Sequence, residues 1–157
     1  MKLEEQLVDL LIEKNYKITT AESCTGGLIA SSIVSVSSAS KVFDVAYVCY
    51  ANEAKVKYLG VSEDTINKFG VVSEEVTTQM AIGALKEANA QVSLVTSGIA
   101  GPGGGSAKKP VGMVCFGIAI KDKVYTYTKQ FGAIGRNAVR EEAVDFILAE
   151  AIRLLSI

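Results

Sequence analysis

The sequence predicts an α/β protein, because segments with helical periodicity alternate with short apolar runs typical of buried strands. Near the carboxyl end, two β-rich segments flank Lys-Asp-Lys at 121–123, which predicts an antiparallel hairpin and therefore a mixed sheet. The chain has 157 residues, 49% of them hydrophobic, which suits one domain with its own core. We therefore expect a single α/β domain over residues 1–157.

The first third of the chain predicts a helix, a strand and a second helix, over residues 2–14, 16–22 and 24–36. The first helix has leucines at helical spacing, and the second is entered through a pair of glycines. After a polar break at 37–40, residues 42–51 are β-rich and apolar on both faces, so they predict a buried strand.

The rest of the chain continues this alternation. Three helices are expected at 52–60, 62–70 and 73–90, with Asn52, Ser62 and Ser73 as N-caps. Glycines at 60 and 70 close the first two. The remaining elements are a buried strand at 91–98, a glycine-rich loop at 99–110, the hairpin at 111–131 and a closing helix at 135–157.

The chain has no histidine, which excludes a Ser-His-Asp triad, a Cys-His dyad and a histidine-based zinc site within it. Any nucleophile must be activated by lysine, tyrosine, a carboxylate or a helix dipole. The net charge of -1 gives no basic field for nucleic acid, and no apolar run reaches membrane-spanning length. The charged start of the chain does not resemble a secretory signal, and three widely spaced cysteines fit free thiols in a reducing cytoplasm.

Ligands of α/β folds lie at the carboxyl ends of the strands, and three loops follow predicted strands, at 22–27, 51–55 and 97–106. We expect these loops to meet at one site. In the first loop, Ser23 lies where a strand turns into a helix whose unpaired N–H groups can stabilise an oxyanion or a phosphate. Alternatively, Ser23 or Thr25 only caps that helix. Cys24 is a rival nucleophile if the helix terminus lowers its pKa, and otherwise a small packed side chain.

The second loop offers Tyr50 and Lys55, and the lysine can act as a base only where burial or nearby positive charge lowers its pKa. Otherwise it is an ordinary solvated helix residue. In the third loop, clustered glycines can present successive N–H groups to a phosphate, although neither a P-loop nor a dinucleotide fingerprint is present. Arg136 and Arg140, at the start of the last helix, can clamp a phosphate or carboxylate, or can be surface arginines.

Several long motifs occur in one order, namely TAESCTGGLIA, YANEAK, GVVSEEV, MAIGALK, SGIAGPGGGS, KPVG and GRNAVR. Together they resemble the CinA carboxy-terminal domain family, over about residues 3–155. Single-domain members of that family include nicotinamide mononucleotide (NMN) amidohydrolases. The sequence lacks the molybdopterin-binding-like amino-terminal domain of two-domain CinA proteins.

The resemblance implies a three-layer α/β/α sandwich on a mixed, mostly parallel sheet. It also implies hydrolysis of the NMN carboxamide to nicotinic acid mononucleotide and ammonia in NAD recycling, by a homo-oligomer that uses no metal or organic cofactor. The family's catalytic serine, lysine and tyrosine fall on Ser23, Lys55 and Tyr50. Residues implied in substrate binding are Cys24, Thr25, Gly26, Gly27, Ser97, Gly98, Gly101 and Arg136, with Arg140 as an alternative to Arg136.

Two other functions remain open from the sequence. One is a non-catalytic nucleotide- or partner-binding module, which would share the pocket but show no turnover. The other is hydrolysis of a phosphate bond, which calls for a metal-binding carboxylate cluster. The candidate loops supply only Glu22 and Glu53 for such a cluster.

Overall fold

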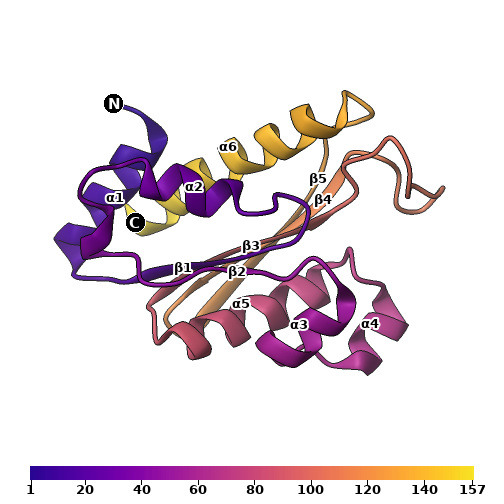
Figure 1. Cartoon of the computed structure of the whole chain (residues 1–157), viewed down its shortest axis with the longest axis horizontal. Helices are drawn as coiled ribbons and strands as arrows, with labels where there is room; N and C mark the ends of the chain where they lie inside the picture. The colour runs from indigo at the N-terminus through magenta and orange to yellow at the C-terminus, as the bar shows by residue number, and fades with distance from the viewer.

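The computed structural model describes residues 1–157 and shows a five-stranded sheet with helices on both faces (Figure 1). The strands are β1 (Ile18–Glu22), β2 (Tyr47–Val48), β3 (Val92–Gly98), β4 (Met113–Ile120) and β5 (Lys123–Gln130). The helices are α1 (Leu3–Lys14), α2 (Leu28–Val34), α3 (Asn52–Leu59), α4 (Glu63–Phe69), α5 (Glu74–Ala88) and α6 (Arg136–Leu155), with a 3₁₀ turn at Ala39–Lys41. The predicted α/β/α sandwich is confirmed.

The strand order is β2-β1-β3-β4-β5. Strand β1 runs parallel to both β2 and β3, and the hairpin β4–β5 is added antiparallel to β3, so the sheet is mixed as expected. The carboxyl ends of the three parallel strands therefore lie at one edge of the sheet. In the hairpin, Ile120 pairs with Lys123, and Lys121 in the turn between them has a left-handed φ of 56°.

The sheet is covered unequally on its two faces. Helices α1, α2 and α6 lie over the larger core, in which Phe116 of β4 packs against Phe146 of α6 with ring centroids 4.7 Å apart. Helices α3, α4 and α5 lie on the other face (Figure 1). Helix α5 approaches the sheet closely because β4 has Gly117 there, where a Cβ would lie 2.7 Å from the Thr77 carbonyl oxygen.

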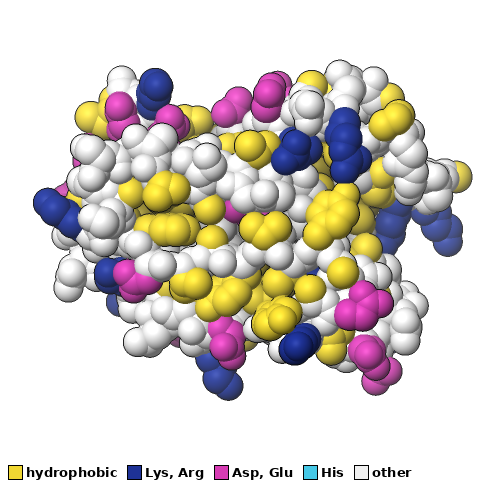
Figure 2. Space-filling view, viewed as in Figure 1, with side chains coloured by type: hydrophobic (Ala, Val, Ile, Leu, Met, Phe, Trp, Pro, Cys, Tyr) yellow, Lys and Arg dark blue, Asp and Glu magenta, His cyan; other side chains and the backbone are white.

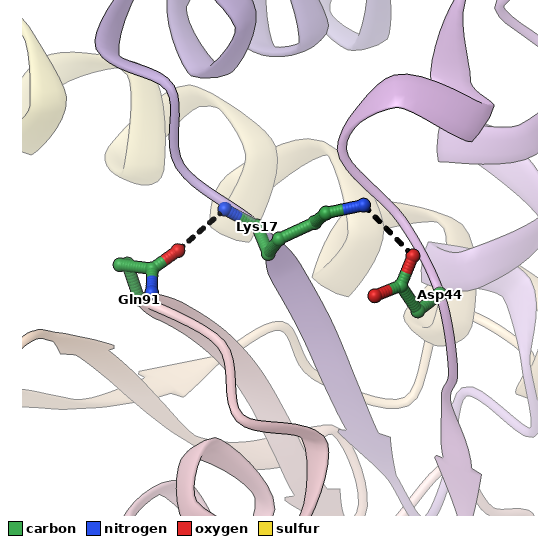
Figure 3. A network of polar contacts seen from close by, with 3 residues as sticks. All are labelled: Lys17, Asp44 and Gln91. Carbon is green, nitrogen blue, oxygen red and sulfur yellow. Dashed lines mark hydrogen bonds and ion pairs between the residues drawn. The ribbon is translucent and has the colours of Figure 1, made fainter.

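A polar network fixes the amino end of the parallel strands, opposite the candidate site (Figure 3). The Lys17 backbone N–H donates to Gln91 Oε1 at 2.8 Å, and the Lys17 ammonium pairs with Asp44 at 2.9 Å. Gln91 in turn donates its backbone N–H to the Lys17 carbonyl at 3.0 Å. These contacts hold the starts of β1 and β3 and the segment before β2 in register.

Two sequence predictions about local structure are wrong. Residues 42–51 were expected to form a buried strand, but β2 is a two-residue strand at the open edge of the sheet, paired only with β1. Tyr47 packs partly against the core on the α5 face, whereas Val48 is 53% exposed, and hydrophobic side chains gather on the face of the molecule shown in Figure 2. The second helix begins at Leu28 rather than residue 24, because Gly26 and Gly27 adopt left-handed φ values of 58° and 104° in a preceding turn.

The remaining elements follow the sequence predictions closely, apart from one cap. Ser73 accepts the Val76 N–H and caps α5, and Gly60 closes α3 in the left-handed conformation. Asn52 lies inside α3, however, and the N-cap position is Ala51. None of the helices has the length and apolar character needed to cross a bilayer.

Candidate active site

The structure brings the three predicted loops together at the carboxyl edge of the parallel strands. The Ser23 N–H donates to the Thr96 carbonyl of β3 at 3.1 Å, and the Cys49 N–H after β2 donates to the Glu22 carbonyl at 3.0 Å. Arg136, the first residue of α6, then joins the other two loops. It donates to the Tyr50 hydroxyl at 2.9 Å and to the Gly101 carbonyl at 2.8 Å.

Ser23 lies in the turn between β1 and α2, with 8% of its surface exposed. Its hydroxyl makes no hydrogen bond to the protein, while every fully buried polar side-chain atom has a partner. The Oγ atom is therefore reachable from solvent. A serine hydroxyl that is both free and accessible can act as a nucleophile once a neighbouring base takes its proton.

Glu22, the residue before Ser23, is fully buried, and its hydrogen-bond donors come from its own strand, the turn and the helix that follows. Its carboxylate accepts the hydroxyl groups of Thr20 at 3.0 Å and Thr25 at 2.7 Å. It also accepts the backbone N–H groups at the start of α2, namely those of Gly27, Ile29 and Ala30, at 3.2, 2.9 and 2.9 Å. Such charge-assisted bonds at a helix N-terminus stabilise a buried carboxylate.

This network corrects the expected source of oxyanion donors. The sequence suggested that unpaired N–H groups at the start of the helix are available, but Glu22 occupies those of Gly27, Ile29 and Ala30. The Gly26 N–H is also taken, by the Ser23 carbonyl at 3.1 Å. Within the turn, the N–H groups of Cys24 and Thr25 are the ones without a protein acceptor.

Lys55 of α3 is one of the largest fully buried side chains, with 1% exposure. Its Nζ donates to the Tyr50 carbonyl at 3.0 Å, and no carboxylate lies within ion-pair distance. An ammonium group has three donors, so burial with one acceptor favours the neutral amine. Burial accordingly lowers the pKa of Lys55 from its ordinary value. The alternative of a solvated helix lysine is wrong.

The thiols beside this lysine are not activated. Burial raises the pKa of Cys24 to about 11, so the alternative of a thiol activated by the helix terminus is wrong, and Cys24 is the small packed side chain. Burial also raises the pKa of Cys49. Both cysteines are free and buried. The Cys49 N–H donates to the carbonyl of Glu22, the residue before Ser23, and Lys55 donates to the carbonyl of Tyr50, the residue after Cys49, so these bonds bring the turn and the lysine into one neighbourhood.

The other predicted binding residues are placed as follows. Thr25 is buried and its hydroxyl bonds to Glu22, while Ser97 donates to the Val71 carbonyl at 2.9 Å. Gly98 ends β3 against Val114, where a Cβ would lie 2.7 Å from a side-chain methyl. Gly101 has a φ of 85°, and a Cβ there would likewise lie too close to a side-chain methyl of Val111.

A cavity of about 310 Å³ lies between the glycine-rich loop and the start of α6. It is lined by Ala100, Pro102, Val111, Ala133, Gly135 and Arg136. Its wall is apolar except for the guanidinium of Arg136, which belongs to an exposed residue. No three His, Cys, Asp or Glu side chains converge anywhere to form a metal site.

Sequence reasoning missed two residues that organise this site. Glu22 was left as an acid with no assigned partner, although an acid just before a Gly-Gly helix entry is a signal for pairing with the helix N-terminus. The sequence predicted Arg140 to be a clamp for a phosphate or carboxylate, or a surface arginine. Its guanidinium instead donates to the carbonyls of Cys24 at 2.9 Å and Thr25 at 3.1 Å. These contacts join residues more than a hundred positions apart, so local spacing gave no signal for them.

The model of the CinA C-terminal domain matches residues 1–155. The chain belongs to the CinA C-terminal domain family. This CinA C-terminal domain is 48% identical to a nicotinamide-nucleotide amidohydrolase, PncC, of Enterobacter agglomerans, with 96% of each chain covered. It is 49% identical to a CinA-like protein of Kosmotoga olearia over 93% of its own length, but spans only 35% of that relative.

Solved structures agree with this assignment. The competence/damage inducible protein CihA of Agrobacterium tumefaciens superposes with a TM-score of 0.95 at 38% identity, covering 99% of this chain and 94% of the other. The three-layer fold on a mixed sheet is therefore that of CinA-superfamily proteins. The resemblance predicted from the sequence motifs is confirmed.

Proposed function

We propose that this protein hydrolyses the carboxamide of NMN to nicotinic acid mononucleotide and ammonia, in the recycling of pyridine nucleotides. The observation that carries the proposal is Lys55, a buried lysine without a carboxylate partner, beside a turn that presents a free serine hydroxyl. The PncC relative, named a nicotinamide-nucleotide amidohydrolase and matched over nearly its whole length, supports this choice of substrate.

In the proposed mechanism, neutral Lys55 takes the proton of Ser23 as the serine oxygen attacks the carboxamide carbon. The N–H groups of Cys24 and Thr25 stabilise the oxyanion of the tetrahedral intermediate. Protonated Lys55 then gives its proton to the amide nitrogen, the C–N bond breaks, and ammonia leaves an ester on Ser23. Water attacks this ester while Lys55 takes its proton, and the proton returns to Ser23 as the acid departs.

Tyr50 completes the proposed catalytic set. Its side chain is 61% exposed, and its hydroxyl accepts from Arg136, which leaves the phenolic proton directed elsewhere. Its carbonyl accepts from Lys55 and orients the amine. Tyr50 therefore connects the base to the binding residues, and its hydroxyl is a second proton donor for the departing ammonia.

Substrate binding is proposed for the turn residues Cys24, Thr25, Gly26 and Gly27, for Ser97, Gly98 and Gly101, and for Arg136. Arg136 lines the cavity beside the glycine-rich loop, so its guanidinium is available to the phosphate of NMN. Backbone N–H groups of the loop would provide further phosphate contacts. Ser97 would contribute through its backbone, because its hydroxyl bonds to Val71.

The proposal is tested by incubating the purified protein with NMN, its riboside and free nicotinamide, and by measuring ammonia and the acid product. We expect release from NMN and none above background from Ser23→Ala. If calorimetry showed NMN binding but no ammonia appeared, the protein would be a non-catalytic nucleotide-binding module. Release of phosphate in place of ammonia would indicate a phosphate-bond hydrolase.

We also propose that the protein is a homo-oligomer that uses the open edge at β2. Val48 and Tyr50 are exposed there, beside one unpaired strand edge. Hydrophobic side chains gather on this face of the molecule (Figure 2). Light scattering of the protein as it leaves a size-exclusion column should give a molecular mass above that of one chain. The substitution Val48→Lys should lower this mass. A wild-type mass of one chain would contradict the proposal.

A cytoplasmic location is proposed from the three free, buried thiols, which suit a reducing compartment. Fractionation of producing cells should place the protein in the cytoplasm. Recovery from the cell exterior would contradict this location.

A further inference from the structure

Arg140 of α6 directs two of its three guanidinium nitrogens at the turn that holds Ser23. Nε donates to the Cys24 carbonyl at 2.9 Å, and Nη2 donates to the Thr25 carbonyl at 3.1 Å. Nη1 is held by Asn137 Oδ1 at 2.9 Å, and Arg140 forms no ion pair. Gly26 makes room for this approach, since a Cβ there would lie 3.3 Å from Nη2.

The carbonyl of Cys24 belongs to the same peptide group as the N–H of Thr25. In a trans peptide the two point in opposite directions, so a cation bound at the carbonyl fixes the N–H on the far side, facing away from Arg140. A charged donor on the carbonyl also polarises the amide, which makes its N–H a stronger donor, because hydrogen bonds in a chain strengthen one another. The Thr25 N–H has no acceptor in the protein.

The preceding peptide group is fixed in a similar way. It carries the N–H of Cys24, and its carbonyl, on Ser23, accepts the Gly26 N–H at 3.1 Å. The N–H of the residue after a nucleophile is a common oxyanion donor in strand-to-helix turns. Both peptide groups that present free N–H groups beside Ser23 are thus anchored through their carbonyls, and one anchor is a cation.

We infer that Arg140 is a positioning residue for catalysis, which holds and polarises the Thr25 peptide so that its N–H stabilises the oxyanion formed on Ser23. The inference rests on the proposed function. It also separates the two arginines at the start of α6. Arg140 has all three nitrogens bonded within the protein and serves the reacting centre, whereas Arg136 lines the cavity and serves binding.

The test is Arg140→Lys, which keeps the positive charge but loses the planar fork that reaches two carbonyls. We expect kcat for NMN to fall about 10-fold, less than the loss of a whole oxyanion donor, with KM within about twofold. The rate at which phenylmethanesulfonyl fluoride labels Ser23, followed by mass spectrometry, should fall in parallel. The matched control Arg153→Lys lies near the other end of α6 and should change neither quantity.

Measurements of NMN binding and of thermal unfolding distinguish a purely structural role of Arg140 from the proposed positioning role. NMN affinity, measured in a Ser23→Ala background, should be unchanged by Arg140→Lys, which shows an intact site. Asn137→Ala, which removes only the Nη1 contact, should lower kcat by a smaller factor without raising KM.

A raised KM with unchanged kcat in Arg140→Lys would make Arg140 a phosphate ligand and overturn the inference. Unchanged kcat and labelling would also overturn it. If Arg140→Lys does not fold, an unchanged labelling rate in Asn137→Ala has the same consequence. If the wild type releases no ammonia from NMN, the proposed function fails, while the labelling rates still decide whether Arg140 controls the reactivity of Ser23.

Discussion

The turn at Glu22–Gly27 and the loop at Ile99–Gly112 both follow strands at the same edge of the sheet, but they are built in opposite ways. Residues 22–25 are buried, and Glu22 and Arg140 tie their polar groups to two helices. Residues 102–108 of the loop are all exposed, and Pro102–Gly105 make no hydrogen bond within the protein. The ends of the loop are closed by Gly112 donating to the Ile99 carbonyl at 2.7 Å, and a turn within it is closed by Ser106 donating to the Lys109 carbonyl at 2.8 Å.

Under the proposed function, this difference separates two tasks of the site. Donors that stabilise a transition state work best when they are fixed before the substrate arrives, and the turn has this property. Groups that bind a phosphate can be ordered by the ligand itself at an acceptable cost in affinity. Substitutions in the turn should therefore lower kcat or stability, whereas substitutions beside the loop should raise KM.

The largest expected effect is at Ser23. Ser23→Ala should lower turnover of NMN by about 10⁴-fold or more while leaving the unfolding temperature nearly unchanged, because the hydroxyl makes no bond in the protein. Cys24→Ala is the matched control and should keep most activity, since burial holds its thiol protonated with a pKa of about 11. Steady-state ammonia release measures both. An inactive Cys24→Ala beside an active Ser23→Ala would reverse the assignment of the nucleophile.

Lys55 should give the next largest loss. Lys55→Arg and Lys55→Ala should both lower kcat by about 10²–10⁴-fold, because guanidinium cannot accept the serine proton. In the wild type, activity should rise with pH through one deprotonation, at a value below that of an ordinary lysine, since burial lowers the pKa of Lys55. Robust activity of Lys55→Arg across pH would make Lys55 a fixed charge and Tyr50 the leading base.

The same lysine should cost stability. Where its folded pKa lies below the unfolded value, the unfolded chain binds more protons, so this contribution makes stability rise with pH through that window. Lys55→Met keeps the volume and removes the charge, and should raise the melting temperature by about 2–4 °C at neutral pH for about 1 kcal/mol gained. This gain in melting temperature should shrink as the pH approaches the pKa of the lysine in the unfolded chain. A fall in melting temperature would show that Lys55 stabilises the fold.

The sequence predicted the fold better than the roles of residues within the site. The Ser73 cap and the acidic first turn predicted α5, a continuous apolar run predicted the buried strand β3, and the motifs pointed to Ser23 and Lys55. Residues 42–51 were misjudged because an apolar run does not reveal whether the strand lies at the centre or at an edge. Arg140 holds the turn through the carbonyls of Thr25 and Cys24, which lie 115 and 116 positions earlier in the chain. Such contacts arise only when the helix packs on the sheet.

A fourth prediction concerns the buried carboxylate that fixes the turn. In Glu22→Gln one of the two acceptor oxygens becomes an NH₂ group, which donates instead of accepting. In place of Oε2 it faces the Ala30 N–H, and in place of Oε1 it faces the donors of Thr25, Gly27 and Ile29. We expect a loss of about 2–3 kcal/mol in the free energy of unfolding, measured by urea denaturation. Glu63→Gln, an exposed glutamate at the start of α4, is the control and should change stability by less than about 0.5 kcal/mol. Equal stability in both variants would mean that the turn does not depend on the Glu22 charge.

The smallest expected effect lies on the loop side, at Arg136. This side chain bridges Tyr50 and Gly101 from an exposed position, so its removal should leave the turn and its chemistry in place. Arg136→Ala should raise KM for NMN about 10-fold, the equivalent of one charge-assisted hydrogen bond to phosphate, and lower kcat much less. KM for the riboside, which has no phosphate, should change by less than about twofold. The ratio of the two KM changes isolates the phosphate contact, because loss of the bridge to Tyr50 affects both substrates alike. An equal rise for both substrates would remove Arg136 from the phosphate site, and a fall in kcat alone would place it with the turn.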